Sequence, residues 1–222
     1  MQYNKAGDTM RKKLALTIYV IVFYAIWTVR TILFSDLFSD INPITAQILK
    51  EIIKTLIWFV PAWILIGKYN DSMFVKKENI FGLKIPWLKL LPVIAVFSVF
   101  ILINSYRTNG KIAINESFGV HSIIIVLFVG VTEETVFRGW LLNSTYTEKN
   151  QYLSIGINAV MFLLIHFPIW SVKGVLLANI VSGGFIQIIL LSVIFSYSFI
   201  KTKNLLVPII LHMYWDLLAF ML

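Results

Sequence analysis

The sequence lacks cysteine and has few charged residues for its length. The absence of cysteine excludes disulfides, thiolate metal ligands and a cysteine nucleophile. Only 14% of the 222 residues are charged, whereas 59% are hydrophobic, and the mean hydropathy is +0.83. Soluble globular domains carry about 25% charged residues. The composition therefore excludes an ordinary soluble domain and predicts an integral membrane protein in a lipid bilayer.

Long apolar segments make up most of the chain, each near the length of about 17–25 residues that crosses a bilayer as a helix. We predict an all-α fold, a polytopic bundle of about seven transmembrane helices with an intramembrane polar cavity. The first three spans form an N-terminal part, residues 1–116, and the last four a core, residues 117–222. The predicted spans are residues 14–34, 45–67, 87–105, 117–143, 151–167, 174–200 and 204–222.

Two of these segments are irregular. In the second, only residues 55–67 are free of charge, which is too short a run to cross alone. We therefore expect the turn before them to lie at the membrane surface with snorkelling lysines, and its charged residues are Lys50, Glu51 and Lys54. In the sixth, Gly183 and Gly184 predict either a broken helix or a short helix followed by a longer one.

The net charge of +8 does not indicate nucleic-acid binding, because the cations lie mainly at the ends of the apolar segments. Cytoplasmic loops carry the greater share of Lys and Arg, which favours a multi-pass protein of the cell membrane with a cytoplasmic N-terminus. The inner side would then hold Lys5, Arg11, Lys12, Lys13, Lys68, Lys76, Lys77, Lys84, Lys89, Lys149, Lys201 and Lys203. The outer side would hold the smaller set, Arg30, Lys50, Lys54, Arg107, Lys111 and Lys173.

Several ionisable residues of the core fall inside the apolar spans. A charge at the bilayer centre costs at least about 2.5–3.5 kcal/mol, so such residues indicate function by default. They are Glu133, Glu134, Arg138, His166, His212 and Asp216. Because lipid cannot solvate these side chains, we expect the helices that carry them to turn them towards one shared cavity.

The spacing of the acidic residues in the fourth span separates their roles. Glu134 and Arg138 are four residues apart, so they can form an ion pair on one helix face. Glu133 points about 100° away and has no partner on its own helix. This spacing predicts that Glu133 is available for chemistry, as a general base.

The same spacing recurs in two later spans. Phe162 and His166 share one face of a helix, and His212 and Asp216 share another. At about 1.5 Å per residue, Glu133 and His212 lie at similar depths. His166 lies further outward than both, so convergence requires its helix to be tilted or to begin later than predicted.

Three motifs in this region resemble those of the CPBP family, which contains membrane-embedded CAAX-processing endopeptidases and the bacteriocin-processing or immunity proteins also called Abi proteins. EETVFRGW resembles the family's EExxxR motif, FLLIH its FxxxH motif and HMYWD its HxxxN/D motif. TKNLLVPIILH is also similar to the run that precedes the family's last histidine. The motifs follow the family's order on successive predicted helices within residues 117–222.

The resemblance implies an intramembrane endopeptidase acting on a peptide or a membrane-associated protein. In the family, the first glutamate and the FxxxH histidine activate a water, which corresponds here to Glu133 and His166. His212 and Asp216 would then stabilise the oxyanion, with Glu134 and Arg138 as a supporting pair. Since an ionised carboxylate cannot donate a hydrogen bond, Asp216 must be protonated or must only orient His212.

The resemblance also leaves a metalloprotease open, because Glu133, His166 and His212 are acceptable zinc ligands. The sequence lacks the HExxH pattern that places two histidines and a glutamate on one helix. We therefore favour catalysis by glutamate without a cofactor, with zinc as the alternative.

Two other functions fit the same residues. A non-enzymatic membrane protein, such as an immunity protein that binds a bacteriocin or its receptor, would use the polar cluster as a structural lock. A small proton-coupled transporter would use the buried carboxylates as a relay.

Overall fold

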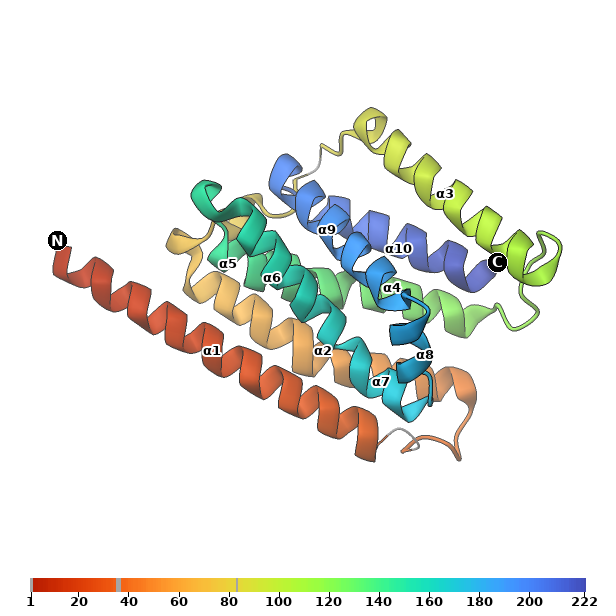
Figure 1. Ribbon diagram of the computed structural model, residues 1–222. Helices are drawn as coiled ribbons and strands as arrows, with labels where there is room; N and C mark the ends of the chain where they lie inside the picture. Colours follow the sequence, from red (N-terminus) through yellow and green to blue (C-terminus); the bar gives the residue numbers. More distant parts are fainter. Residues whose placement is uncertain (1, 35–36, 83) are drawn as a thin grey trace.

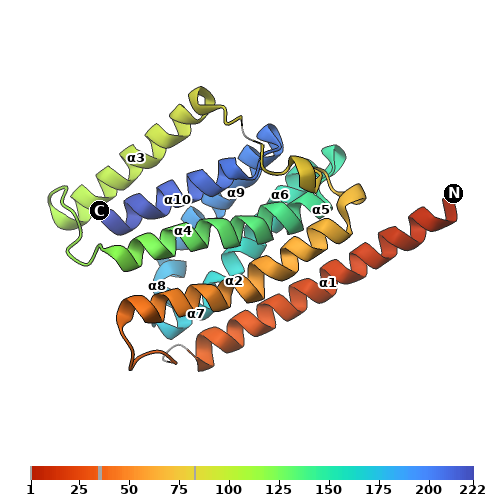
Figure 2. The ribbon, with the colours of Figure 1, turned by 180° about the vertical axis from the view of Figure 1, so that it is seen from behind.

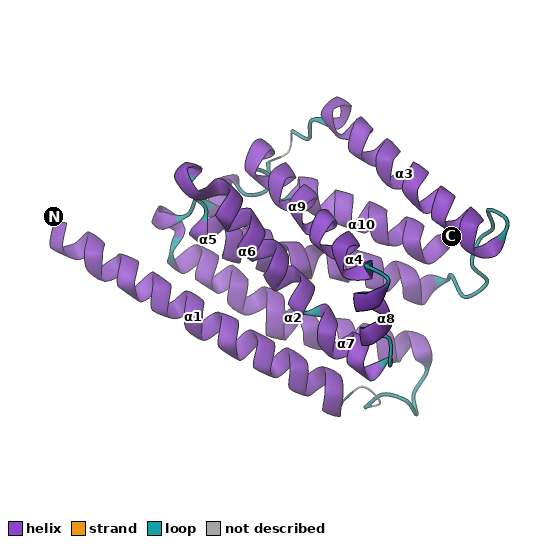
Figure 3. Cartoon of the chain, in the orientation of Figure 1, coloured by secondary structure: helices purple, strands orange, loops and turns teal. Residues whose placement is uncertain are grey.

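The computed structural model describes residues 2–34, 37–82 and 84–222. Of these, residues 2–6 and 8 are described without their side chains, so Lys5 of the predicted inner set lies outside the described side chains. All regular elements in the described ranges are helical, with no strand among them (Figure 3). The predicted all-α fold is confirmed.

The chain up to Thr145 contains most of the long helices of one layer and the two glutamates of the EExxxR motif. Its helices are α1 (Gln2–Leu33), α2 (Pro43–Lys68), α3 (Trp87–Asn109), α4 (Val120–Glu134) and the short α5 (Asn143–Thr145), with a π-helical segment, η3 (Thr135–Leu142), between the last two. The second half contains α6 (Gln151–Leu164), α7 (His166–Val172), α8 (Leu176–Val181), α9 (Gly184–Thr202) and α10 (Leu206–Met221). Single 3-10 turns are η1 (Asn70–Ser72), η2 (Lys77–Asn79) and η4 (Glu148–Asn150).

The helices form two layers (Figures 1 and 2). Figure 2 shows α3, α10, α4, α2 and α1 side by side in one layer, and Figure 1 shows α6, α7, α8 and α9 across the other face. Helix α4 packs against both α2 and α10, while α6 packs against α9 and η3. The segment with both glutamates therefore lies at the centre of the bundle.

Five helical segments of the described chain are long and apolar enough to cross a membrane: Thr9–Leu33, Trp87–Asn109, Val120–Thr145, Glu148–Val172 and Gly184–Thr202. Beside them, α2 has 26 residues but carries charges within its length, and the apolar α10 has 16 residues. Each predicted span thus corresponds to a helix or a pair of consecutive helices. The protein is an α-helical membrane bundle.

The expected surface turn at the start of the second span is wrong. Helix α2 begins earlier, at Pro43, where Oδ1 of Asn42 accepts hydrogen bonds from the backbone N–H groups of Ile44 and Thr45. This side-chain cap followed by proline is a strong start signal. Glu51 and Lys54 consequently lie two turns or more inside the helix, and both are buried instead of reaching the surface.

The glycine pair in the sixth predicted span separates two helices. Helix α8 ends at Val181 and α9 begins at Gly184. Between them, Gly183 has φ +78°, a left-handed conformation that glycine adopts without a steric penalty. The second alternative, a short helix followed by a longer one, is confirmed.

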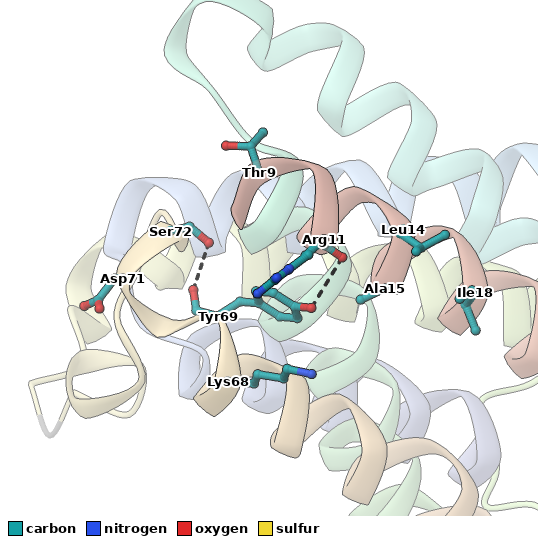
Figure 4. A pocket seen from close by; sticks show the side chains of 9 residues that line it. All are labelled: Thr9, Arg11, Leu14, Ala15, Ile18, Lys68, Tyr69, Asp71 and Ser72. Carbon is teal, nitrogen blue, oxygen red and sulfur yellow. Dashed lines mark hydrogen bonds between the residues drawn. The ribbon is translucent and has the colours of Figure 1, made fainter. Parts of the chain in front are cut away.

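One end of the bundle collects many cations of the predicted inner set. There, Lys12 Nζ donates to the carbonyl oxygens of Ser72 at 3.0 Å and Ser144 at 3.1 Å, which ties α1 to the segments after α2 and η3. Arg11 and Lys68 line a pocket of about 750 Å³ at this end (Figure 4). None of the residues lining this pocket belongs to the six predicted site residues.

Candidate active site

The two glutamates lie where α4 changes into the π-helical segment η3. All residues from Thr132 to Asn143 are buried. π-Helical turns are rare and occur frequently at functional sites, because the wider turn redirects side chains. This stretch places the EExxxR motif within protein instead of against lipid.

Glu134 contacts two other predicted site residues through a single oxygen. Its Oε1 accepts from Nη1 of Arg138 at 2.8 Å and lies 2.7 Å from Nδ1 of His212. The predicted pair between Glu134 and Arg138 is therefore present. Because a carboxylate paired with a guanidinium only accepts hydrogen bonds, Nδ1 of His212 carries the proton and donates it. This contact fixes the tautomer of the imidazole.

Glu133 has no partner on its own helix, as expected, but it is paired with a cation of another helix. Its Oε1 lies 2.8 Å from Nζ of Lys54, and both side chains are buried. The ammonium also lies 4.6 Å from the ring centroid of Trp58 and 5.7 Å from that of Trp27. The spacing of residues along a helix predicts only partners on that helix, whereas Lys54 belongs to α2.

His212 faces carboxylates on both sides. Its Nε2 lies 3.5 Å from Oδ2 of Asp216, one turn further along α10. The imidazole stacks on Phe195, with centroids 4.9 Å apart and planes at 21°. Asp216 is more open than its partner, with 20% of its side chain exposed against 7% for His212. The Nε2 side of His212 is thus the side that a reacting group can approach.

His166 begins α7, directly after a turn at Ile165 that ends α6. Its Nδ1 lies 2.9 Å from the carbonyl oxygen of Phe162. A carbonyl only accepts, so Nδ1 is the donor, and Nε2 of the neutral ring keeps a lone pair. His166 therefore presents a basic nitrogen on the side away from its own helix.

The ring of Phe162 lies between the two histidines. Its centroid is 5.3 Å from that of His166 and 5.8 Å from that of His212. Glu133 directly precedes Glu134, which contacts His212. The expected convergence is therefore observed: α4 with η3, the start of α7, and α10 bring the six predicted residues to one site.

The comparisons with known proteins point to the same part of the chain. Residues 115–218 match the model of the family described as type II CAAX prenyl endopeptidase Rce1-like. Residues 115–218 thus form a region similar to the Rce1-like family. A search of curated proteins and a search of solved structures each gave no match. The Rce1-like region includes the three motifs, which confirms the resemblance and supports a CAAX-type intramembrane endopeptidase.

Serines of α9 complete the surroundings of Arg138 in the Rce1-like region. Nη2 of Arg138 donates to Oγ of Ser192 at 2.6 Å and to its carbonyl oxygen at 2.9 Å, and Nε donates to Oγ of Ser196 at 3.4 Å. The guanidinium lies 4.6 Å from the ring centroid of Phe162 and 5.4 Å from that of Phe195. Arg138 is fully buried, and hydrogen bonds engage each of its nitrogens.

The same network returns to the π-helical segment. Oγ of Ser196 donates to Oδ1 of Asn158 at 3.2 Å, and Nδ2 of Asn158 donates to the carbonyl oxygen of Phe137 in η3 at 2.8 Å. Sequence reasoning missed these residues, although Ser192 and Ser196 share a helix face in an apolar run. The four-residue spacing of Ser192 and Ser196 could have identified these serines from the sequence. The sequence carries no comparable signal that Lys54 lies at the site.

The zinc alternative names Glu133, His166 and His212 as the ligands. Among the residues that the structure describes, no group of three or more His, Cys, Asp or Glu side chains could hold a metal ion. Of the three named ligands, Glu133 is paired with Lys54. Nδ1 of each histidine is engaged by an acceptor, which leaves Nε2 as the nitrogen that faces a reacting group, as in metal-bound histidines. The pairing of Glu133 with Lys54 is the feature of this set that differs from a metal centre.

Proposed function

We propose that this protein hydrolyses a peptide bond of a peptide or a membrane-associated protein, using a water activated by Glu133 and His166. One observation carries the proposal: the Rce1-like region brings a buried carboxylate and two imidazoles, each with Nδ1 engaged by an acceptor, to one site. The role of each residue remains part of the proposal.

The first step is activation of water. His166 offers the lone pair of Nε2 as the proton acceptor, and the carboxylate of Glu133 orients the water through its oxygen atoms. As the proton leaves, the water oxygen forms a bond to the carbonyl carbon of the substrate. The π electrons of that carbonyl move to its oxygen, which becomes the oxyanion.

His212 stabilises the oxyanion. In this step His212 acts as the imidazolium: Nδ1 donates to Glu134, and the second N–H, at Nε2, donates to the oxyanion. The 3.5 Å separation between Nε2 and Oδ2 of Asp216 is long for a hydrogen bond. The N–H group at Nε2 can therefore donate to the oxyanion without losing a strong partner. Asp216 then orients His212 and does not itself donate.

Collapse of the tetrahedral intermediate completes the reaction. The carbonyl re-forms, the bond from carbon to the amide nitrogen breaks, and the leaving amine takes the proton that the water gave up. Glu134 and Arg138 contact neither water nor substrate in this scheme. They support the reaction by holding Nδ1 of His212 in place.

The setting of the activity is proposed on sequence grounds. We propose a cytoplasmic N-terminus, from the distribution of Lys and Arg, and a division into N-terminal helices at 1–116 and a catalytic core at 117–222. The substrates proposed are a bacteriocin or signalling peptide during processing or self-protection. Prenylated CAAX peptides are a second class to include in the assay.

The test compares purified wild type and Glu133→Gln in liposomes, using a quenched peptide library with and without a zinc chelator. We expect cleavage by the wild type, loss of cleavage in the variant, and unchanged cleavage under chelation. Glu133→Gln keeps the shape of the side chain, so size-exclusion profile and helix content should match the wild type. Full activity in Glu133→Gln would remove this residue from the mechanism.

A second function is supported by the enclosure of the charged network. Glu134 and Arg138 are both 0% exposed, as a lock between helices would be. A non-enzymatic immunity or binding protein would keep its protective effect in Glu133→Gln and would cleave no peptide of the library. A protection assay in cells, run beside the cleavage assay, distinguishes the two functions.

A further inference from the structure

Lys54 belongs to α2, outside the matched residues 115–218, yet its ammonium lies in the candidate active site. Only 8% of Lys54 is exposed, and buried lysines are rare unless they are paired. The rings of Trp58 and Trp27 flank the ammonium, so its position is restricted on the side away from Glu133. The N-terminal helices therefore contribute a charge to the site.

Among the described residues, Lys54 is the cation that forms an ion pair with Glu133, whereas Arg138 pairs with Glu134 and donates to Ser192 of α9. The side chains of Lys54 and Glu133 are only 8% and 9% exposed, so solvent screens their attraction little. Lys54 thus balances the charge that the catalytic glutamate brings.

The contact is made to one oxygen of Glu133. Lys54 hydrogen-bonds Oε1, and no hydrogen bond in the described chain engages Oε2. A carboxylate that orients a water needs one oxygen held and the other open. The pairing with Lys54 produces this asymmetry, because it holds Oε1 towards α2.

We propose that Lys54 is a positioning residue that holds the Glu133 carboxylate so that Oε2 faces the reacting water. This role rests on the proposed peptidase activity of the same site. Removal of the ammonium should let the carboxylate rotate, so the chemical step slows while substrate binding is unchanged. An error of about 1 Å in such a group costs on the order of 100-fold in rate.

The activity test uses Lys54→Met, Lys54→Arg and the matched control Lys50→Met in liposomes, with a peptide that the wild type cleaves. Lys50 lies on the same helix, about one turn before Lys54, and forms no ion pair among the described residues. We expect kcat of Lys54→Met to fall on the order of 100-fold with KM within about twofold. Lys54→Arg should regain most of the loss, and Lys50→Met should match the wild type.

A stability measurement tests the pair without activity. Thermal unfolding in detergent should give a lower Tm for Lys54→Met than for Lys50→Met, by on the order of 10 °C, because a buried carboxylate loses its partner. The double variant Lys54→Met with Glu133→Gln should recover most of that loss. If the two substitutions lower Tm additively instead, the pair does not exist and the inference is overturned.

The outcomes separate the inference from the proposed function. If Lys54→Met cleaves at the rate of Lys50→Met, the positioning role is refuted while the peptidase remains. If kcat falls but Lys54→Arg restores nothing, the loss reflects packing and the positioning role is also refuted. If the wild type cleaves no peptide, the proposed function falls and the positioning role falls with it, even where the Tm measurements confirm the pair.

Discussion

Replacement of Arg138 by methionine tests whether the buried network holds the bundle together. Methionine keeps an unbranched chain between the rings of Phe162 and Phe195 but removes the charge. The side chain of Glu134 is 0% exposed, and its carboxylate would then keep only the contact with Nδ1 of His212. The oxygens of Ser192 would also lose their donor.

The magnitude follows from this burial. Removal of one partner from a buried ion pair costs about 3–5 kcal/mol. For a chain of this size, about 1 kcal/mol corresponds to a shift in Tm of about 2–4 °C. Because neither charge of the pair is exposed, solvent does not screen the loss. We expect Tm of Arg138→Met to fall by about 6–20 °C.

The assay is thermal unfolding in detergent, followed by tryptophan fluorescence and by size exclusion. Arg107→Met is the control, since Arg107 lies exposed in the last turn of α3. A second substitution, Glu134→Gln, in the Arg138→Met background removes the stranded charge and should restore most of the stability. The reasoning is wrong if Arg138→Met and Arg107→Met unfold at the same temperature.

Two further substitutions test other parts of the site. A Cβ on Gly130 would lie 2.6 Å from Cγ of Met213 and 3.3 Å from the carbonyl oxygen of Ile209, so Gly130→Val should push α10 away from α4 and lower both Tm and cleavage; unchanged unfolding would contradict this close approach. Asp216→Asn keeps the size of the side chain and a polar group near Nε2 of His212, so it should retain cleavage, whereas Asp216→Ala should lower kcat. Equal kcat for both Asp216 variants would show that this residue does not orient His212.

Much of the candidate site was predictable because its residues are conspicuous in an apolar sequence. Charges such as Glu133 and Arg138 cannot face lipid, so convergence followed from energetics before any geometry was known. The pair of Glu134 with Arg138 followed from four-residue spacing within one helical segment. The turn that starts α7 at His166 was not visible, because Ile165 carries no strong turn signal.

The sequence by itself determined that this is an all-α membrane bundle and which ionisable residues must turn inward, because both results depend on the properties of single segments in lipid. Only the tertiary structure decided which helices face each other. The sequence predicts that Lys54 lies at the membrane surface. In the fold it lies against Glu133, because α2 begins at Pro43 and packs along α4. Which residues of other helices pair with a buried charge depends on how the helices pack. The spacing of residues along one helix does not predict these partners.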